Sequence, residues 1–216
     1  MMASISTLRA SLPDAAALGE AAARVVTSQL DPVAFDVHAV PGPQGSGGTL
    51  LLRFASTPRA TRAQVDAARA LLHGADTDVL EGVDEAGVWR AQVARAWDAP
   101  GLVARLAWRS ASLQHVIDRL ATASSEFAVE IELAGRVSVG AGVVRIGGTT
   151  ERQARVIAAL RAEGPLFGAV VLLRADRVCK DLIDVWGAPS GAMTALASIK
   201  AAFDPAGILN AGRGPV

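Results

Sequence analysis

The order of predicted strands and helices most constrains how this chain folds, because the same order occurs in both halves. Period-two apolar alternation predicts the strands, and amphipathic runs that begin at Ser, Thr, Asp or Pro predict the helices. In the first half the predicted strands are 3–11, 33–39, 49–55 and 77–82, and the helices are 14–30 and 61–74. In the second half the predicted strands are 102–108, 127–133, 143–147 and 167–173, and the helices are 112–123 and 149–164.

Strand–helix–strand–strand–helix–strand is the ferredoxin-like order. The fold class that we predict is therefore α+β, with two tandem ferredoxin-like units whose two sheets pack together and each carry helices on one side. The first unit with its linker helix spans residues 1–98, the second spans 99–179, and a C-terminal helix and tail span 180–216. All three segments are expected to form one domain.

Composition excludes several classes of function. The formal net charge of the 216 residues is zero, so no basic excess predicts a nucleic-acid partner or an anionic membrane surface. Cys179 is the single cysteine, and without a Cys/His cluster we expect no metal site. The N-terminal residues lack the layout of a signal peptide, and apolar runs such as 167–173 are of strand length. We therefore expect a cytoplasmic protein without direct membrane insertion.

The C-terminal residues carry a family resemblance. The helix-like run AMTALASIKAA (192–202) is followed by FDPAGILNAGRGPV (203–216). This ending resembles the C-terminal signature of FAD-linked oxidases, most closely the FAD-binding subunit of glycolate oxidase. That family has phenylalanine, Asp-Pro, a glycine turn and Asn-Pro-Gly-Arg, and Ala211 stands here at the position of the second proline. The segment IDVWGAP (183–189) and the Trp-containing linker before residue 99 are also similar to this family.

The resemblance implies a fold and a chemistry. The substrate, or cap, domain of these oxidases has two ferredoxin-like halves, in agreement with the duplicated pattern. The family's reaction oxidises a small 2-hydroxy acid, such as glycolate or D-lactate, to the 2-oxo acid, with electrons passing through FAD. Carried over to this chain, the resemblance implies cofactor contacts from Asn210, Gly212 and Arg213.

A domain that binds the flavin phosphates is not evident in the sequence. The glycine-rich segment PGPQGSGG (41–48) lies between two predicted strands, whereas a phosphate-binding loop should open a helix. We interpret it as a hairpin turn, and Gly147-Gly148 as a turn between a strand and a helix. The chain is thus expected to need a separate flavin-binding domain or subunit, together with other oxidase subunits. Alone it should be inactive and should not retain FAD.

Strand parity selects candidate site residues, because alternate side chains share one face of a sheet. Charged residues gather on one face of each unit, including Arg9, Asp36, Glu130 and Glu132. Guanidinium groups suit bidentate recognition of a substrate carboxylate. His38 is the candidate base for the substrate hydroxyl proton. The candidate substrate-binding residues are Arg53, Arg105, Arg109 and Arg145.

Two alternatives stay open at this point. The charged face can be a solvated surface with salt bridges and no ligand. The whole chain can also be a non-catalytic ferredoxin-like module that binds a small molecule or a protein partner, because paired units of this kind build regulatory domains and fold does not settle function. The DPAGILNAGR ending (204–213) favours the oxidase interpretation, because a regulatory module has no evident need for it.

Overall fold

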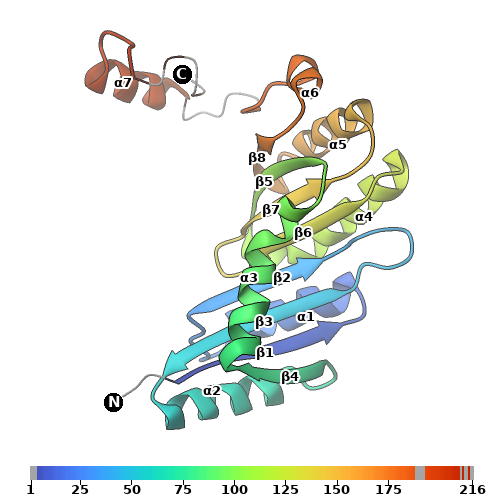
Figure 1. The fold of residues 1–216 in the computed structure, drawn as a ribbon, viewed down its shortest axis with the longest axis vertical. Helices are drawn as coiled ribbons and strands as arrows, with labels where there is room; N and C mark the ends of the chain where they lie inside the picture. Colours follow the sequence, from blue (N-terminus) through green and yellow to red (C-terminus); the bar gives the residue numbers. More distant parts are fainter. Residues whose placement is uncertain (1–3, 188–192, 210, 212–213, 215–216) are drawn as a thin grey trace.

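The computed structural model describes residues 4–187, 193–209, 211 and 214. These residues form an α+β fold around one antiparallel sheet with the strand order β4-β1-β3-β2-β6-β7-β5-β8 (Figure 1). The strands are β1 (Ser4–Leu12), β2 (Ala34–Ala39), β3 (Gly48–Ser56), β4 (Asp76–Glu81), β5 (Leu102–Trp108), β6 (Ile131–Arg136), β7 (Ala141–Ile146) and β8 (Phe167–Arg174). The helices are α1 (Ala15–Val26), α2 (Pro58–Leu71), α3 (Gly82–Asp98), α4 (Leu113–Phe127), α5 (Thr150–Ala162), α6 (Arg177–Leu182) and α7 (Met193–Phe203).

The α+β class and the order of elements within each half are as predicted, but the prediction of two packed sheets is wrong. Each half contributes four neighbouring strands, and β2 pairs with β6 to join them into a single sheet. The facing pairs run from Asp36–Arg136 to Ala39–Leu133. Both strands would otherwise be sheet edges with unpaired backbone N–H and C=O groups. Edge-to-edge pairing satisfies these groups without stacking the sheets.

The main core lies between the sheet and the helices α1, α2, α4 and α5. Contacts connect α2 with β1, α1 with β3, α4 with β6 and α5 with β8, so each half covers this face with its own pair of helices. Leucines of the strands and helices fill the layer, and Leu50, Leu52 and Leu120 are fully buried. Asp14, Thr57 and Thr149 each accept a hydrogen bond from an amide in the first turn of α1, α2 and α5, which explains where these helices begin.

The linker helix α3 crosses the opposite face of the sheet (Figure 1). Its C-terminal end is held by Arg174 of β8, whose guanidinium donates to the carbonyl oxygens of Ala96, Trp97, Ala99 and Gly101 at 2.6–3.2 Å. The last carbonyls of a helix lack partners within the helix, so one arginine satisfies several of them at once. The sequence predicted a helix in the linker but not its position on the sheet.

The strand predicted at 127–133 lies further along the chain. Helix α4 continues to Phe127, and Ala128 ends it in the left-handed conformation with φ of 49°. The Val129 amide then donates to the Ser124 carbonyl, and the Ser124 hydroxyl donates to the Val129 carbonyl. Strand β6 therefore begins at Ile131, and the turn between β6 and β7 spans only residues 137–140.

We expect Gly140→Ala to destabilise the fold. Gly140 lies in the turn between β6 and β7 with φ of +60°, and a Cβ atom there would collide with the Trp108 carbonyl oxygen. Left-handed backbone and the collision together should lower the free energy of unfolding by about 1–3 kcal/mol, measured by urea denaturation. Gly164→Ala is the matched control, because nothing lies within 4 Å of its added Cβ. Equal stability of the two variants would contradict this turn geometry.

Candidate functional site

Strand register places His38, Arg53, Arg105 and Arg145 on the sheet face that α3 crosses. Facing residues of paired strands project to the same side of a sheet, as do residues two or four apart on one strand. The pairs that establish the common face are Ala34–Arg53, His38–Ala134, Ala134–Val143, Arg105–Val143 and Glu132–Arg145. The predicted charged face therefore exists, and it is continuous across both halves because β2 pairs with β6.

Two residues assigned to this face by parity lie outside the strands. Strand β5 ends at Trp108, so Arg109 is an exposed residue before a short 3-10 turn and does not share a strand face with Arg105. Glu130 precedes β6 and is exposed, and its carboxylate is 3.9 Å from the Arg145 guanidinium. Arg105 and Arg109, and likewise Glu130 and Glu132, were expected to share a strand face, and this is wrong: β5 ends at Trp108, before Arg109, and β6 begins at Ile131, after Glu130.

Helix α3 covers part of the charged face and neutralises Arg53. Glu85 of α3, only 4% exposed, lies 2.7 Å from Arg53 Nε and accepts a hydrogen bond of 3.0 Å from the Thr7 hydroxyl. Trp89 donates from its indole nitrogen to the same hydroxyl, and its ring lies 5.7 Å from the Arg53 guanidinium. This part of the charged face is thus covered by α3 and is not an open sheet surface. Arg53 holds α3 on the sheet.

His38, Glu132 and Arg145 form a second cluster across the joined strands. His38 Nε2 lies 2.9 Å from one oxygen of Glu132, and Arg145 Nε lies 3.2 Å from the other. Burial and the nearby positive charge of Arg95 lower the pKa of His38, against the opposing effect of Glu132. The neutral ring therefore donates from Nε2 to Glu132 and keeps an unprotonated Nδ1 that can accept a proton.

A hollow of about 300 Å³ opens beside α3, over β6 and β7. Asp36, Gln92, Arg105 and Arg136 line it, and Ala134, Ala141 and Val143 are among its apolar lining residues. Gln92 donates from its amide nitrogen to the Val37 carbonyl at 3.0 Å and to Asp36 Oδ2 at 3.5 Å. Burial raises the pKa of Asp36, while the Gln92 hydrogen bond and the Arg136 charge oppose this shift. Sequence reasoning missed Gln92 and Arg136, because nothing in the linker or the shifted strand showed that they meet.

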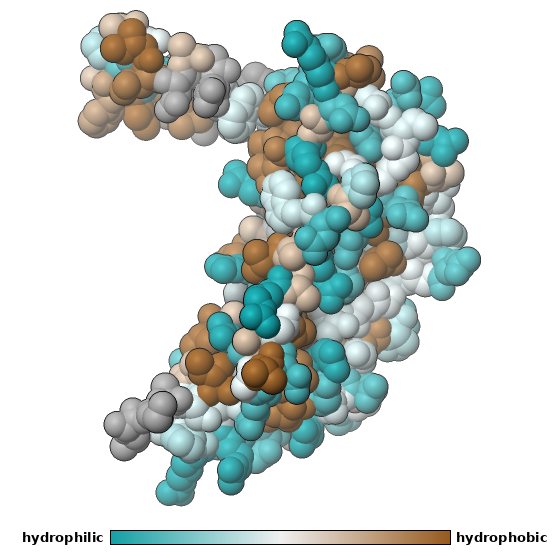
Figure 2. All heavy atoms as spheres, viewed as in Figure 1, coloured by the Kyte–Doolittle hydropathy of each residue, from teal (hydrophilic) through white to brown (hydrophobic). Residues whose placement is uncertain are grey.

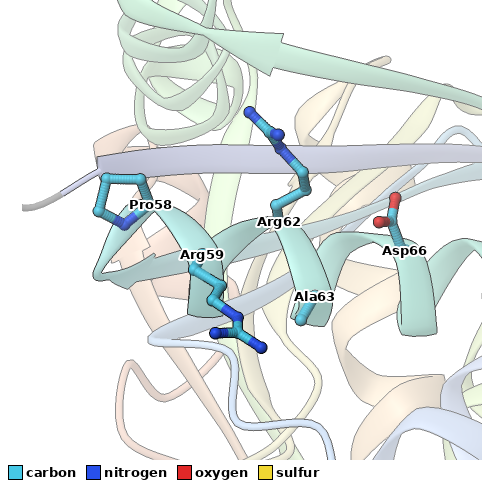
Figure 3. A pocket seen from close by; sticks show the side chains of 5 residues that line it. All are labelled: Pro58, Arg59, Arg62, Ala63 and Asp66. Atoms are coloured by element: carbon cyan, nitrogen blue, oxygen red, sulfur yellow. The ribbon is translucent and has the colours of Figure 1, made fainter.

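Other hollows lie elsewhere on the described part of the chain. One of about 350 Å³ lies along the start of α2, where Arg59 and Arg62 extend in different directions (Figure 3). Another, of about 550 Å³, lies between the loop that follows β2 and the end of α4, with Arg145 among its lining residues. A third, of about 450 Å³, lies beside Gly148 and Arg174, but the Arg174 guanidinium is occupied by carbonyl groups of the α3 end.

The glycine-rich segments do not fit the phosphates of a flavin nucleotide. Residues 41–48 connect β2 to β3, with a bridge between Gly42 and Gly45, and so do not open a helix. The turn at Gly148 does precede α5, but Gln153 fills it by donating to the carbonyl oxygens of Ile146 and Gly148. Both interpretations from the sequence agree with this geometry. Within the described residues these two loops therefore give FAD no pyrophosphate cradle.

The tail is organised around Asp204, which follows α7. Its carboxylate accepts hydrogen bonds from the Lys200 ammonium at 2.6 Å and from the Ile208 and Leu209 amides at 3.0 Å. Lys200 also donates to the Leu209 carbonyl, and Gly207 turns the chain with φ of +64°. The Lys200 hydrogen bond and the two amides lower the pKa of Asp204 despite partial burial. The Asp-Pro and glycine of the tail thus close a compact helix–loop unit. The predicted cofactor contacts Asn210, Gly212 and Arg213 lie outside the described residues.

Helix α7 has no buried residue, although most of its side chains are apolar. Leu196, Ile199 and Phe203 are exposed, as are Ile208 and Leu209 in the loop that follows. Figure 1 shows α7 apart from the sheet and its helices, and Figure 2 shows the brown, hydrophobic surface of this unit. An isolated helix of this length is marginal in water. The helix–loop unit therefore presents an apolar surface with nothing from the described part of the chain packed on it.

Comparison with known proteins points to this same unit. The family model described as "FAD linked oxidases, C-terminal domain" matches residues 188–213. Among solved structures, the crystal structure of a microcompartment protein from Desulfitobacterium hafniense DCB is 18% identical, with coverage of 83% of this chain and 99% of that chain. Its TM-score is 0.28, too low to carry an argument. The comparison with curated proteins gave no match.

Among the residues that the structure describes, no helix combines the length and apolar character needed to cross a membrane. Over the same residues, no group of three or more His, Cys, Asp or Glu side chains is arranged to hold a metal ion. Cys179 is buried, and burial raises the pKa of its thiol.

We expect His38 to make the stability of the chain fall in mild acid. Its pKa in the folded state lies below the ordinary value of about 6.5, so the unfolded state takes up the proton first as pH falls. The contribution of neutral His38 to stability is complete above the unfolded-state pKa, and it is lost as the pH falls through the lower folded-state pKa. Urea denaturation at neutral and mildly acidic pH should show a smaller loss of stability for His38→Asn than for the wild type. His73→Asn, at an exposed histidine, is the control, and equal losses in both variants would refute the assignment.

Asp204→Ala should open the tail loop without unfolding the sheet. The variant removes the acceptor of the Ile208 and Leu209 amides and of Lys200. Hydrogen exchange at both amides should become faster, while the amides of β1 and β3 stay protected. Asp181→Ala, at an exposed carboxylate of α6, should leave the same amides unchanged. In the wild type the Asp204 carboxylate should lose these hydrogen bonds only in acid, because it becomes protonated as the pH falls through its lowered pKa.

Proposed function

We propose that the chain is the cap domain of an FAD-linked oxidase and acts together with a flavin-binding domain or subunit. One observation carries the proposal: the family match at residues 188–213 covers the helix–loop unit of α7 and Asp204, whose apolar surface is exposed. A surface of this kind fits the face of a partner. The flavin-binding partner supplies the redox chemistry, which is the transfer of electrons from the substrate to FAD.

The duplicated element order also supports the proposal of a cap domain. Each half runs strand–helix–strand–strand–helix–strand, and each contributes four adjacent strands to the sheet. We propose that residues 1–98 and 99–179 are two ferredoxin-like units and that 180–216 is the docking tail. Arg161 of α5 holds the start of this tail against the second unit. Its guanidinium donates to the carbonyl oxygen of Val170 in β8 and to those of Asp184 and Val185 in the tail.

The substrate class that we propose is a small 2-hydroxy acid of the glycolate or D-lactate type, oxidised to the 2-oxo acid. Arginine suits its carboxylate, and neutral His38 is the candidate proton acceptor. Among the four proposed arginines, Arg53 and Arg145 already pair with Glu85 and Glu132. Arg105 lines the hollow beside α3 and has no ion pair among the described residues, which favours it for substrate binding.

The test is co-expression of this chain with flavin-binding chains of FAD-linked oxidases from the same genome. The chain alone should be colourless and should not oxidise glycolate or D-lactate with an artificial electron acceptor. Co-expression should give a yellow complex with stoichiometric FAD and activity. A chain that binds FAD stoichiometrically by itself, or the lack of any complex with the flavin-binding chain, would contradict the proposal.

Exposed apolar residues of the helix–loop unit should be required for assembly. The double variant Ile199→Ser/Phe203→Ser should weaken binding of the flavin-binding chain at least about tenfold, because it removes two large apolar side chains from the contact. Val33→Ser/Val139→Ser removes comparably exposed apolar residues of the body and should bind as the wild type does. Equal affinity of both double variants, measured by calorimetry or pull-down, would place the partner elsewhere.

A further inference from the structure

Over β5, β7 and β8, the sheet face that α3 crosses is apolar and partly exposed. Strand register places five small side chains there around Arg105, each only half-buried: Ala107, Ala141, Val143, Ala169 and Val171. These five residues form the outer apolar face. Val93, exposed on α3, borders it at the hollow. A sheet normally buries an apolar face against another layer, so this face is suited to a further element.

In the first half, the equivalent face is covered by the helix that follows the last strand of that half. Helix α3 follows β4 and lies on β1, where Glu85 and Trp89 both contact Thr7. In the second half, the chain after β8 passes through α6, which packs on α5, and then forms α7. Because the two halves repeat one order of elements, α7 has the place in the second half that α3 has in the first.

The helix–loop unit of α7 matches the outer apolar face in chemistry and size. Its exposed large apolar side chains are Leu196, Ile199, Phe203, Ile208 and Leu209. If each buries about 100 Å², one contact removes roughly 1,000 Å² from water, counting both surfaces, and two contacts remove about 2,000 Å². A stable interface buries about 1,200–2,000 Å². A pair of such contacts is therefore large enough for a stable complex, whereas a single one is not.

These observations favour a second copy of the chain as the occupant of the face. Helix α7 stands apart from the sheet of its own chain, and none of its residues is buried (Figure 1). Two copies related by a two-fold axis can exchange the unit reciprocally, which forms the contact twice. The formal net charge of the chain is zero, so net charge does not keep two copies apart. Arg105 within the face is compatible with this, since arginine is enriched at interfaces.

We propose that the chain alone forms a two-fold dimer in which the α7 helix–loop unit of each copy lies on the outer apolar face of the other. The exchanged unit lies beside α3 and covers Arg105 and the hollow. Both surfaces belong to this chain, so the proposal does not rest on the proposed function. A partner that binds the same unit competes with the dimer.

Sedimentation equilibrium of the full chain tests the dimer. We expect the mass to rise toward that of two chains with increasing concentration, with a Kd at or below about 50 µM. Ile199→Ser/Phe203→Ser in the unit and Val171→Glu on the face should each weaken the dimer at least about tenfold, because each removes apolar contact. Val33→Glu, at an exposed valine before β2, is the matched control and should dimerise as the wild type does. A chain that stays monomeric up to about 500 µM, or a dimer that either variant leaves unchanged, would overturn the proposal.

Cysteine pairs distinguish exchange between copies from docking within one chain. A mixture of the Ile199→Cys and Val171→Cys proteins should give a covalent dimer with a short bismaleimide, in a yield that neither protein reaches alone. Native Cys179 is buried and should not react. A chain that carries both substitutions should form no internal cross-link when it is diluted well below the Kd. An internal cross-link under these conditions would show that α7 docks on its own sheet and would overturn the exchange. Every measurement uses this chain alone, so failure here is distinct from failure of the co-expression test.

Discussion

Four facing residue pairs between β2 and β6 join the two halves of the chain into one sheet, and the candidate site depends on them. They bring Asp36 beside Arg136 and carry His38 within 2.9 Å of Glu132, so each cluster combines residues from both halves. The same pairing satisfies backbone groups that two separate sheets would leave at their edges. A single continuous face results, long enough for α3 to lie across it.

Helix α3 then divides that face into a structural part and a part that can meet a ligand. Under its first half, Glu85 and Trp89 hold Arg53 and Thr7 in a compact contact. Towards its second half, Gln92 reaches Asp36 and leaves the hollow with Arg105 beside it. Two of the arginines selected from the sequence, Arg53 and Arg145, therefore form ion pairs within the fold. The Arg105 side chain is exposed and lines the hollow.

The sequence predicted the class, the element order and the charged face, because period-two alternation fixes which side chains share a side of a strand. It misplaced β6, since no Gly or Pro marks the end of α4 and Ala128 adopts a left-handed conformation that alanine rarely takes. Pairing of β2 with β6 and docking of α3 are long-range contacts, which local patterns do not encode. Gln92 and Arg136 were missed for that reason. The turn organised by Asp204 is a local feature, and the Asp-Pro pair and the glycine of the tail indicate it in the sequence.

The continuous charged face and the hollow beside α3 exist only where β2 pairs with β6, so the account of the site rests on the two halves forming one sheet in solution. Solution NMR of the full chain tests this premise most directly, through NOEs between backbone protons of facing residues. The account predicts NOEs between His38 and Ala134 and between Asp36 and Arg136. Their absence, with the pairs inside each half intact, would contradict it.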